Sequence, residues 1–299
     1  MTGDRSMRDW PPIKEPELLA RLALDDEGFL ASAHEFAAVW GRRSYEPALL
    51  ERALGYPWDR PGGSYVLRED KVEDLGDLGP QRRAAIVTAF TEDRHPVLAF
   101  GGNVAPTWLT VKFAHFPDPR DREVLVLAGV LHDIDVGASA SPSPLGNMPA
   151  TLFASPGTAV RAVMVWCSTA QITQLTWTEV PYFLGRLDDA VFIMDEAEVK
   201  VEQIFAYISR FGAFCVDDEP VALSAVPAAD RTARELTQEE LLDLVAPRLV
   251  GPQARAEDLV HAVWEDMASV IARAAKTLWP CAQQFQAPWT RFPAVAPMR

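Results

Sequence analysis

Apolar residues near the N-terminus recur at the three- and four-residue spacing of an α-helix. Within residues 16–55 this spacing connects Phe29, Ala33, Phe36, Ala37 and Trp40, and it predicts helical structure there. Pro47 suits the first turn of a further short helix. Another helix is expected over residues 80–91, which also begin with proline. We therefore interpret residues 1–95 as an N-terminal helical arm.

The pattern changes near residue 96, from where short apolar runs dominate to about residue 226. The runs that predict strands are Val97–Phe100, Glu123–Val136, Ala150–Phe153, Ala159–Trp166, Tyr182–Leu187, Val191–Met194, Val201–Ile208 and Val221–Val226. Many are apolar on both faces, unlike the strands of a sheet with one solvated face. A closed or strongly curled barrel fits this pattern better. Two helices are expected to interrupt the strands, at 106–113 and 169–179.

Helical patterns return in the last quarter of the chain. Thr237 and Glu240 have the spacing of a capping box, which predicts a helix start. Residues 255–279 carry the apolar stripe of an amphipathic helix. The pattern thus divides the chain into an N-terminal arm, a strand-rich part over 96–235 and a C-terminal helical extension over 236–299.

Charge and cysteine content narrow the function classes. The formal net charge of −14 argues against binding to nucleic acid or to an anionic membrane surface. The three cysteines are far apart in sequence and form no C-x-x-C pair, which favours a reducing, cytoplasmic setting without a zinc site. The acidic run His132–Asp135 is expected to be a solvated strand end, so no metal and no other cofactor is expected.

A glycine turn is the first candidate for chemistry. Val97–Phe100 leads into Gly101, Gly102 and Asn103, and Pro106 suits the first turn of the helix behind them. Glycines allow a close backbone approach to a ligand, and N–H groups at such a turn attract anions and carbonyl oxygens. An ordinary strand-to-helix turn is the alternative.

Glu179 is the second candidate. Ser168 and Gln171 have capping-box spacing, so a helix should begin at residue 169, and Pro181 should end it near Glu179. Steps of three and four residues place Glu179 on the face of Ile172 and Leu175, the apolar face of this helix. A carboxylate held among apolar residues is suited to general acid–base catalysis. The alternative is a carboxylate that reaches solvent at the helix end.

Together these segments resemble the γ-glutamylcyclotransferase-like (AIG2-like) family over residues 96–235. The family's Tyr-Gly-Ser-Asn turn corresponds to Phe100-Gly101-Gly102-Asn103. Then come Met148–Gly157 with its Ser-Pro-Gly turn, the strand Val160–Trp166, and the helix that ends in Leu-Thr-Trp-Thr-Glu179, in the family's order. The resemblance implies an α+β fold, a small mixed β-barrel with flanking N- and C-terminal helices.

The resemblance also implies a reaction. In the family, the α-amine of a γ-glutamyl amide attacks its own γ-carbonyl, releasing 5-oxoproline and an amine. Glu179 would be the general acid/base. Phe100, Gly101, Gly102 and Asn103 would bind the substrate, a small molecule with a γ-glutamyl or similar acyl-amine group, and Tyr207 would add a hydrogen bond. No cofactor is needed, because the substrate supplies its own nucleophile.

Two departures from the family motif leave alternatives open. Phe100 replaces a tyrosine and Gly102 replaces a serine, so two hydroxyl groups are missing although the backbone donors remain. The alternatives are a non-catalytic binding protein of the same fold and an enzyme acting on another amide. A Glu179 that faces an enclosed pocket beside the Gly101–Asn103 turn would favour an enzyme.

Overall fold

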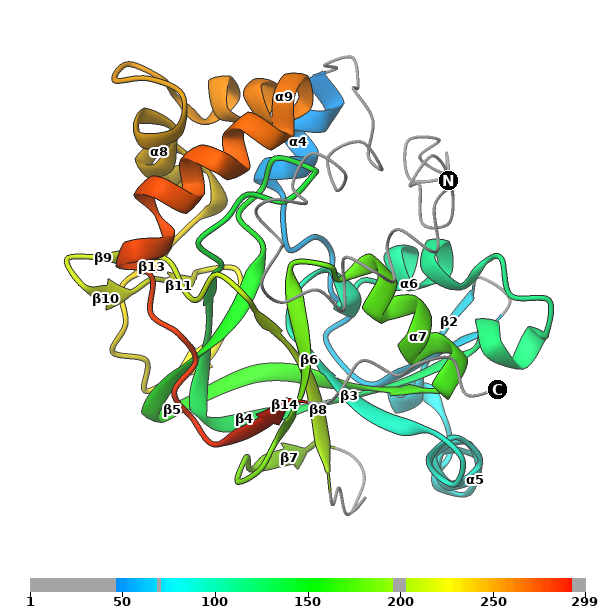
Figure 1. Cartoon of the computed structure of the whole chain (residues 1–299). Helices are drawn as coiled ribbons and strands as arrows, with labels where there is room; N and C mark the ends of the chain where they lie inside the picture. The colour runs from blue at the N-terminus through cyan, green and yellow to red at the C-terminus, as the bar shows by residue number, and fades with distance from the viewer. Residues whose placement is uncertain (1–46, 69–70, 196–202, 292–299) are drawn as a thin grey trace.

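The computed structural model of the protein describes residues 47–68, 71–195 and 203–291 (Figure 1). The helical pattern predicted over residues 16–46 lies outside this range. The described chain has a mixed α/β architecture, with a large mixed sheet and six helices. The helices are α4 (Pro47–Leu54), α5 (Pro80–Thr91), α6 (Pro106–Phe113), α7 (Thr169–Thr178), α8 (Gln238–Leu249) and α9 (Ala256–Thr277).

Twelve strands pair into one sheet. The main path runs β13-β11-β4-β5-β3-β8-β6-β14, with β1, β2, β7 and β12 attached beside it. These strands are β1 (Tyr65–Arg68), β2 (Lys71–Asp74), β3 (His95–Ala99), β4 (Val124–Ala138), β5 (Ala150–Cys167), β6 (Tyr182–Leu187), β7 (Phe192–Met194), β8 (Ile204–Ser209), β11 (Ala222–Leu223), β12 (Ala228–Ala229), β13 (Glu235–Leu236) and β14 (Trp289–Arg291). A separate pair is formed by β9 (Cys215–Val216) and β10 (Glu219–Pro220). Most neighbours are antiparallel, whereas β3 and β8 run parallel, as do β11 and β13.

The long antiparallel pair β4–β5 corrects one prediction. Ser155-Pro156-Gly157 does not reverse the chain, and the two strands predicted around it are a single strand, β5. Gly157 has a φ of +84° and lies in a bulge of β5, where residues 155–158 face Asp133 of β4 alone, whose φ is 61°. The Asp133 carboxylate accepts a hydrogen bond from the Gly157 N–H at 2.8 Å. The glycine therefore absorbs a local twist of the ladder, as is usual for a bulge, instead of making a turn.

The same stretch of β4 corrects a second prediction, because Asp135 is not solvated. Its side chain is fully buried and forms a two-pronged ion pair with Arg231, whose contacts are both 2.8 Å long. The predicted strand Val221–Val226 is also shorter than expected. Only Ala222 and Leu223 pair, since the chain then turns, with the Val226 N–H donating to the Leu223 carbonyl.

The central strands are buried on both faces, which explains their apolar runs. Val97 and Ala99 of β3 belong to a core shared with α6 and α7. Leu98, between them, points to the opposite face and belongs to the larger core that also includes residues of α4, α8 and α9. Side chains alternate across a strand, so a run apolar at every position predicts this double burial.

The helices occupy two regions around the sheet. Figure 1 shows α4, α8 and α9 grouped at one end of the molecule, while α6 and α7 lie side by side near β3. The capping box predicted at Thr237 is confirmed at the start of α8, and the amphipathic pattern at 255–279 forms α9. Among the described residues no helix has the length and apolar character needed to cross a membrane.

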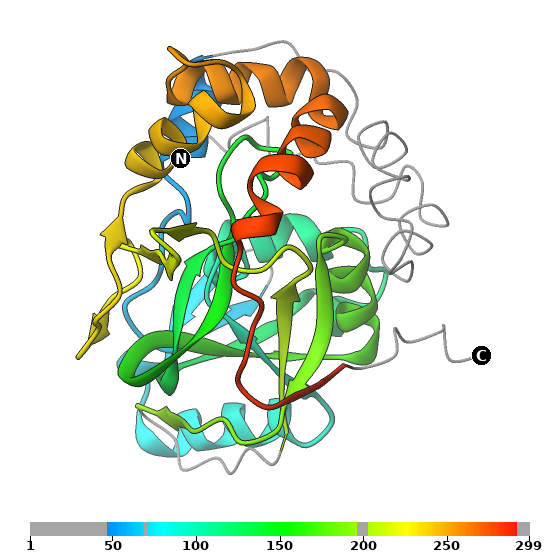
Figure 2. The ribbon, with the colours of Figure 1, turned by 60° about the vertical axis from the view of Figure 1, so that its left-hand side comes forward.

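Segments on both sides of residues 96–235 join the sheet. β1, from the N-terminal part, pairs with β4, and β14, from the C-terminal part, pairs with β6. Figure 2 shows the chain leaving α9 and running along the molecule to reach β14 at the other end. The flanking regions are therefore built into the structure that positions the site, described next.

Candidate functional site

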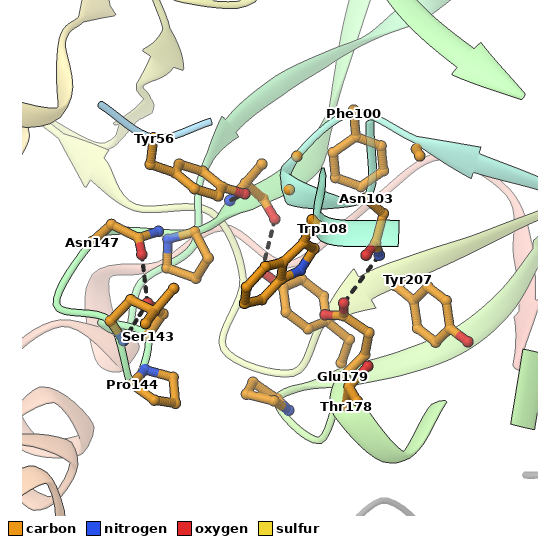
Figure 3. A pocket seen from close by; sticks show the side chains of 18 of the residues that line it. Tyr56, Phe100, Asn103, Trp108, Ser143, Pro144, Asn147, Thr178, Glu179 and Tyr207 are labelled. Carbon is orange, nitrogen blue, oxygen red and sulfur yellow. Dashed lines mark hydrogen bonds between the residues drawn. The ribbon is translucent and has the colours of Figure 1, made fainter. Parts of the chain in front are cut away.

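A pocket lies where β3 ends and its path diverges from β5. Its cavity has a volume of about 100 Å³ and is lined by the glycine turn, by α6 and α7, by the loop between β4 and β5, and by Tyr56 and Trp58 (Figure 3). β3 pairs only with the second half of β5, from Val163 to Cys167. The first residues of β5, beginning at Ala150, therefore remain open toward the pocket. Glu179, Phe100, Gly101, Gly102, Asn103 and Tyr207, the residues predicted from the sequence, all line it.

Glu179 lies at the C-terminal end of helix α7, beside this pocket. The predicted capping box is confirmed: the Ser168 hydroxyl accepts from the Gln171 N–H, and the Gln171 side chain accepts from the Ser168 N–H. Ile172 and Leu175 are buried, as expected for the inner face. The helix ends at Thr178, and Glu179 is its C-cap, with φ −109° and ψ 40°. Its side chain is 18% exposed, so it is partly shielded and still open to the pocket.

Two side chains from a distant part of the sequence meet at one oxygen of Glu179. The Asn103 amide donates to Oε1 at 3.0 Å, and the Lys112 ammonium donates to the same oxygen at 2.7 Å. Lys112 also donates to the side-chain oxygen Oδ1 of Asn103 at 2.8 Å, so each of the three side chains is hydrogen-bonded to the other two. The Glu179 Oε2 atom accepts no hydrogen bond from the described part of the chain. The arrangement fixes one carboxylate oxygen and leaves the other available to a ligand.

Lys112 was not predicted from the sequence, although a signal was present. It lies on α6 three residues after Leu109 and four after Trp108, on the buried face of the helix. Its side chain is only 1% exposed. A buried ammonium needs a partner, because its loss of hydration is costly. The reasoning that places Glu179 on an apolar face applies to Lys112 as well, and the two charges neutralise each other.

The glycine turn offers free backbone donors. The N–H groups of Gly101 and Asn103 donate no hydrogen bond within the described residues, while the carbonyls of Gly101 and Gly102 close the short 3₁₀ turn Gly102–Val104. Two aromatic side chains lie so close to this turn that only glycine fits at positions 101 and 102. A Cβ on Gly101 would collide with the Tyr56 hydroxyl, and one on Gly102 would lie 2.6 Å from the Trp58 ring. Trp58 thus occupies the space that a serine side chain at position 102 would need.

Two tyrosines hold the open start of β5. The Tyr56 hydroxyl accepts from the Ala150 N–H at 2.9 Å, and the Tyr182 hydroxyl donates to the Ala150 carbonyl at 2.8 Å. Burial raises the pKa of Tyr56 to about 12, partly offset by the Ala150 N–H. Burial likewise raises the pKa of Tyr182 well above its usual value, and the charge of Glu179 adds to this. Both hydroxyls therefore stay protonated, and they supply the hydrogen bonds that a neighbouring strand would otherwise make.

Phe100 and Tyr207 contribute buried walls. Phe100 is 5% exposed, and its carbonyl accepts a hydrogen bond from the Arg60 guanidinium. The Tyr207 hydroxyl is engaged with α7: it lies 2.9 Å from the Thr176 hydroxyl and donates to the Ile172 carbonyl at 3.2 Å. Burial raises the pKa of Tyr207 well above its ordinary value. Tyr207 lines the pocket with its ring and anchors the helix that carries Glu179.

Within the described ranges no group of three His, Cys, Asp or Glu side chains is placed to hold a metal ion. No protein-family model matches the sequence, and the search of curated proteins gives no match either.

Proposed function

We propose that this protein is a γ-glutamylcyclotransferase-like enzyme. It would cyclise a γ-glutamyl amide to 5-oxoproline and release an amine, and its sheet would curl as in the small barrel of that family. The observation that carries the proposal is the hydrogen bond between Asn103 and Glu179. These residues are 76 positions apart, and each ends one of the two segments that resemble the family. Their convergence in one pocket is what that chemistry requires.

The reaction can be assigned to this geometry step by step. Glu179 Oε2 takes a proton from the α-ammonium of the substrate, and the free amine attacks the γ-carbonyl carbon. A new C–N bond closes the five-membered ring while the original amide C–N bond breaks. The ring nitrogen gives up a second proton as the lactam forms, and Glu179 relays it as well; the departing amine receives both protons and leaves as an ammonium ion, so no water is consumed. Holding amine and carbonyl within one molecule supplies the effective concentration that this attack needs.

The glycine turn would stabilise the oxygen that becomes negative during the attack. The free N–H groups of Gly101 and Asn103 are fixed donors of the kind found in oxyanion sites. They are backbone groups, so replacing the family serine by Gly102 does not remove them. Lys112 binds Oε1 of Glu179 at 2.7 Å, which leaves Oε2 to accept the first proton.

A non-catalytic binding protein with the same fold is the second candidate. The observation favouring it is the pairing of Glu179 with Lys112 at 2.7 Å, because an ion pair of this kind can be purely structural. Trp58 occupies the space that the side chain of the family serine would need at position 102, which also favours a binding protein. Under this alternative the pocket would bind a γ-glutamyl compound without converting it.

One experiment separates the two candidates. Purified protein is incubated with a panel of γ-glutamyl amides and dipeptides, and 5-oxoproline and free amine are quantified by mass spectrometry. The enzyme proposal expects release by the wild type and its loss in Glu179→Gln. Binding of a panel member in calorimetry, with no release from any of them, would favour the binding protein. Neither release nor binding, in a folded protein, would refute both.

A further inference from the structure

The pocket wall across from Glu179 is a loop between β4 and β5 that is held rigidly. Within it, the Ser143 hydroxyl donates to the side-chain oxygen Oδ1 of Asn147 at 2.6 Å and accepts from the Leu145 N–H at 3.1 Å. Gln238 of α8 binds both backbone groups of Met148, at 3.0 and 2.7 Å. The C-terminal helices thus fix this loop in place, as a preorganised binding surface requires.

Two polar side chains of this loop offer donors to the pocket. Asn147 is 1% exposed, and its Nδ2 atom makes no hydrogen bond within the described chain. In Figure 3 this nitrogen points toward the side of the pocket where Glu179 lies. Ser141 is 3% exposed and also lines the pocket, so its hydroxyl is a second polar group on this wall. Buried donors without partners are costly, and a ligand atom that accepts from them removes that cost.

An apolar surface separates this polar end from Glu179. The rings of Trp58 and Trp108 lie 5.1 Å apart, and Trp108 packs with Leu145 of the loop. Figure 3 shows Trp108 between Asn147 and Ser143 on one side and Glu179 on the other. A ligand that spans the pocket therefore meets polar groups at both ends and aromatic rings between them.

The charges of the pocket restrict the ligand further. Among the residues that line it, Lys112 and Glu179 are the charged ones, and they pair with each other. No lining cation remains for a carboxylate at the Asn147 end. A carboxylate there would lose its hydration without compensation, whereas an uncharged carbonyl would lose much less.

We propose that Ser141 and Asn147 form a subsite for an uncharged hydrogen-bond acceptor on the leaving amine. The preferred substrates are then γ-glutamyl amides of amines that carry a carboxamide or similar neutral carbonyl. They are favoured over γ-glutamyl amino acids, whose leaving group ends in a carboxylate. This inference rests on the proposed cyclotransferase function and names its substrate class.

The test compares three matched substrates: γ-glutamyl-glycinamide, γ-glutamyl-glycine and γ-glutamyl-ethylamide. The wild type should process the glycinamide with a kcat/KM about tenfold above that of the other two, the size of one good hydrogen bond. Asn147→Asp keeps the oxygen that accepts from Ser143 and replaces the free donor by a second oxygen. It should abolish the preference for the glycinamide while leaving the ethylamide, which lacks an acceptor, within about threefold.

Two results would overturn the subsite. One is equal kcat/KM for the glycinamide and glycine substrates in the wild type. The other is an unchanged preference in Asn147→Asp. If this variant does not fold, Ser141→Ala replaces it, with a partial loss of preference expected and an unchanged preference counting against the subsite.

A separate binding experiment distinguishes failure of the subsite from failure of the proposed function. If no γ-glutamyl compound is cyclised, N-propionylglycinamide and N-propionylglycine are compared as ligands by saturation-transfer NMR. Selective binding of the amide by the wild type, lost in Asn147→Asp, would sustain the subsite without the cyclotransferase reaction. Equal binding of both compounds, or binding of neither, would refute it.

Discussion

The ion pair between Lys112 and Glu179 makes a quantitative prediction about stability. At an effective dielectric constant of about 20, two unit charges 2.7 Å apart attract by roughly 6 kcal/mol, and desolvation offsets several kcal/mol of this. Glu179→Gln leaves a lysine that is 1% exposed without a counter-charge, so it should cost about 3 kcal/mol or more. Lys112→Met leaves a carboxylate that is 18% exposed and still bound by Asn103, so about 1–3 kcal/mol is expected.

The double variant should lose less than the sum of the two single losses. We expect a coupling energy of about 3 kcal/mol, within the range measured for close charge pairs. The assay is urea unfolding at pH 7 of the wild type, both single variants and the double variant. Arg82 and Glu73 are the matched control: they are 2.6 Å apart but 65% and 34% exposed. Their coupling should stay below about 1 kcal/mol. A Lys112–Glu179 coupling as small as the control's would refute the buried pair.

Three further predictions concern the surroundings of the site. Gly102→Ser should destabilise the fold by about 1–3 kcal/mol, because the new side chain would contact Trp58. In thermal unfolding, adding Trp58→Ala should restore part of this loss, and an unchanged midpoint for Gly102→Ser would contradict the close packing. Ser168→Ala removes a helix cap and should cost about 1 kcal/mol in urea unfolding, whereas no loss would mean that the capping box does not hold α7. The pKa of Tyr56 is raised from 10.0 to about 12, so the unfolded chain loses this proton first and the free energy of unfolding should fall as pH rises above 10. Urea midpoints at pH 8 and pH 11 measure this fall, and Tyr56→Phe should reduce it; an equal fall in the variant would assign it to other groups.

The sequence predicts the helices best where proline or a capping box marks their start. α5 and α6 begin and end at the expected residues, because Pro80 and Pro106 occupy first-turn positions. The β4–β5 pair was less predictable. Ser155-Pro156-Gly157 has the composition of a turn, but long-range pairing with β4 keeps the chain extended. The register of a partner strand is not encoded in the local pattern.

Within the site, too, local spacing predicts the direction of some side chains, whereas contacts between distant segments are not predicted. Helical spacing places Glu179 on an inner face without knowledge of the fold. Lys112 satisfies the same spacing, but lysine is so rarely buried that this spacing alone does not predict an inward side chain. Tyr56 and Trp58 reach the glycine turn from the N-terminal part of the chain, a contact for which no local pattern exists. The unpartnered nitrogen of Asn147 depends on the hydrogen bonds within the loop, which no local pattern predicts.

The most direct test of the central claim is the release of 5-oxoproline from γ-glutamyl amides by the wild type and by Glu179→Gln. The wild type should release 5-oxoproline and amine in equal amounts. The variant, folded as judged by circular dichroism, should be at least about 100-fold slower, as expected when a general acid/base is removed. Equal rates for the two proteins, or no release by the folded wild type from any substrate in the panel, would contradict the cyclotransferase function.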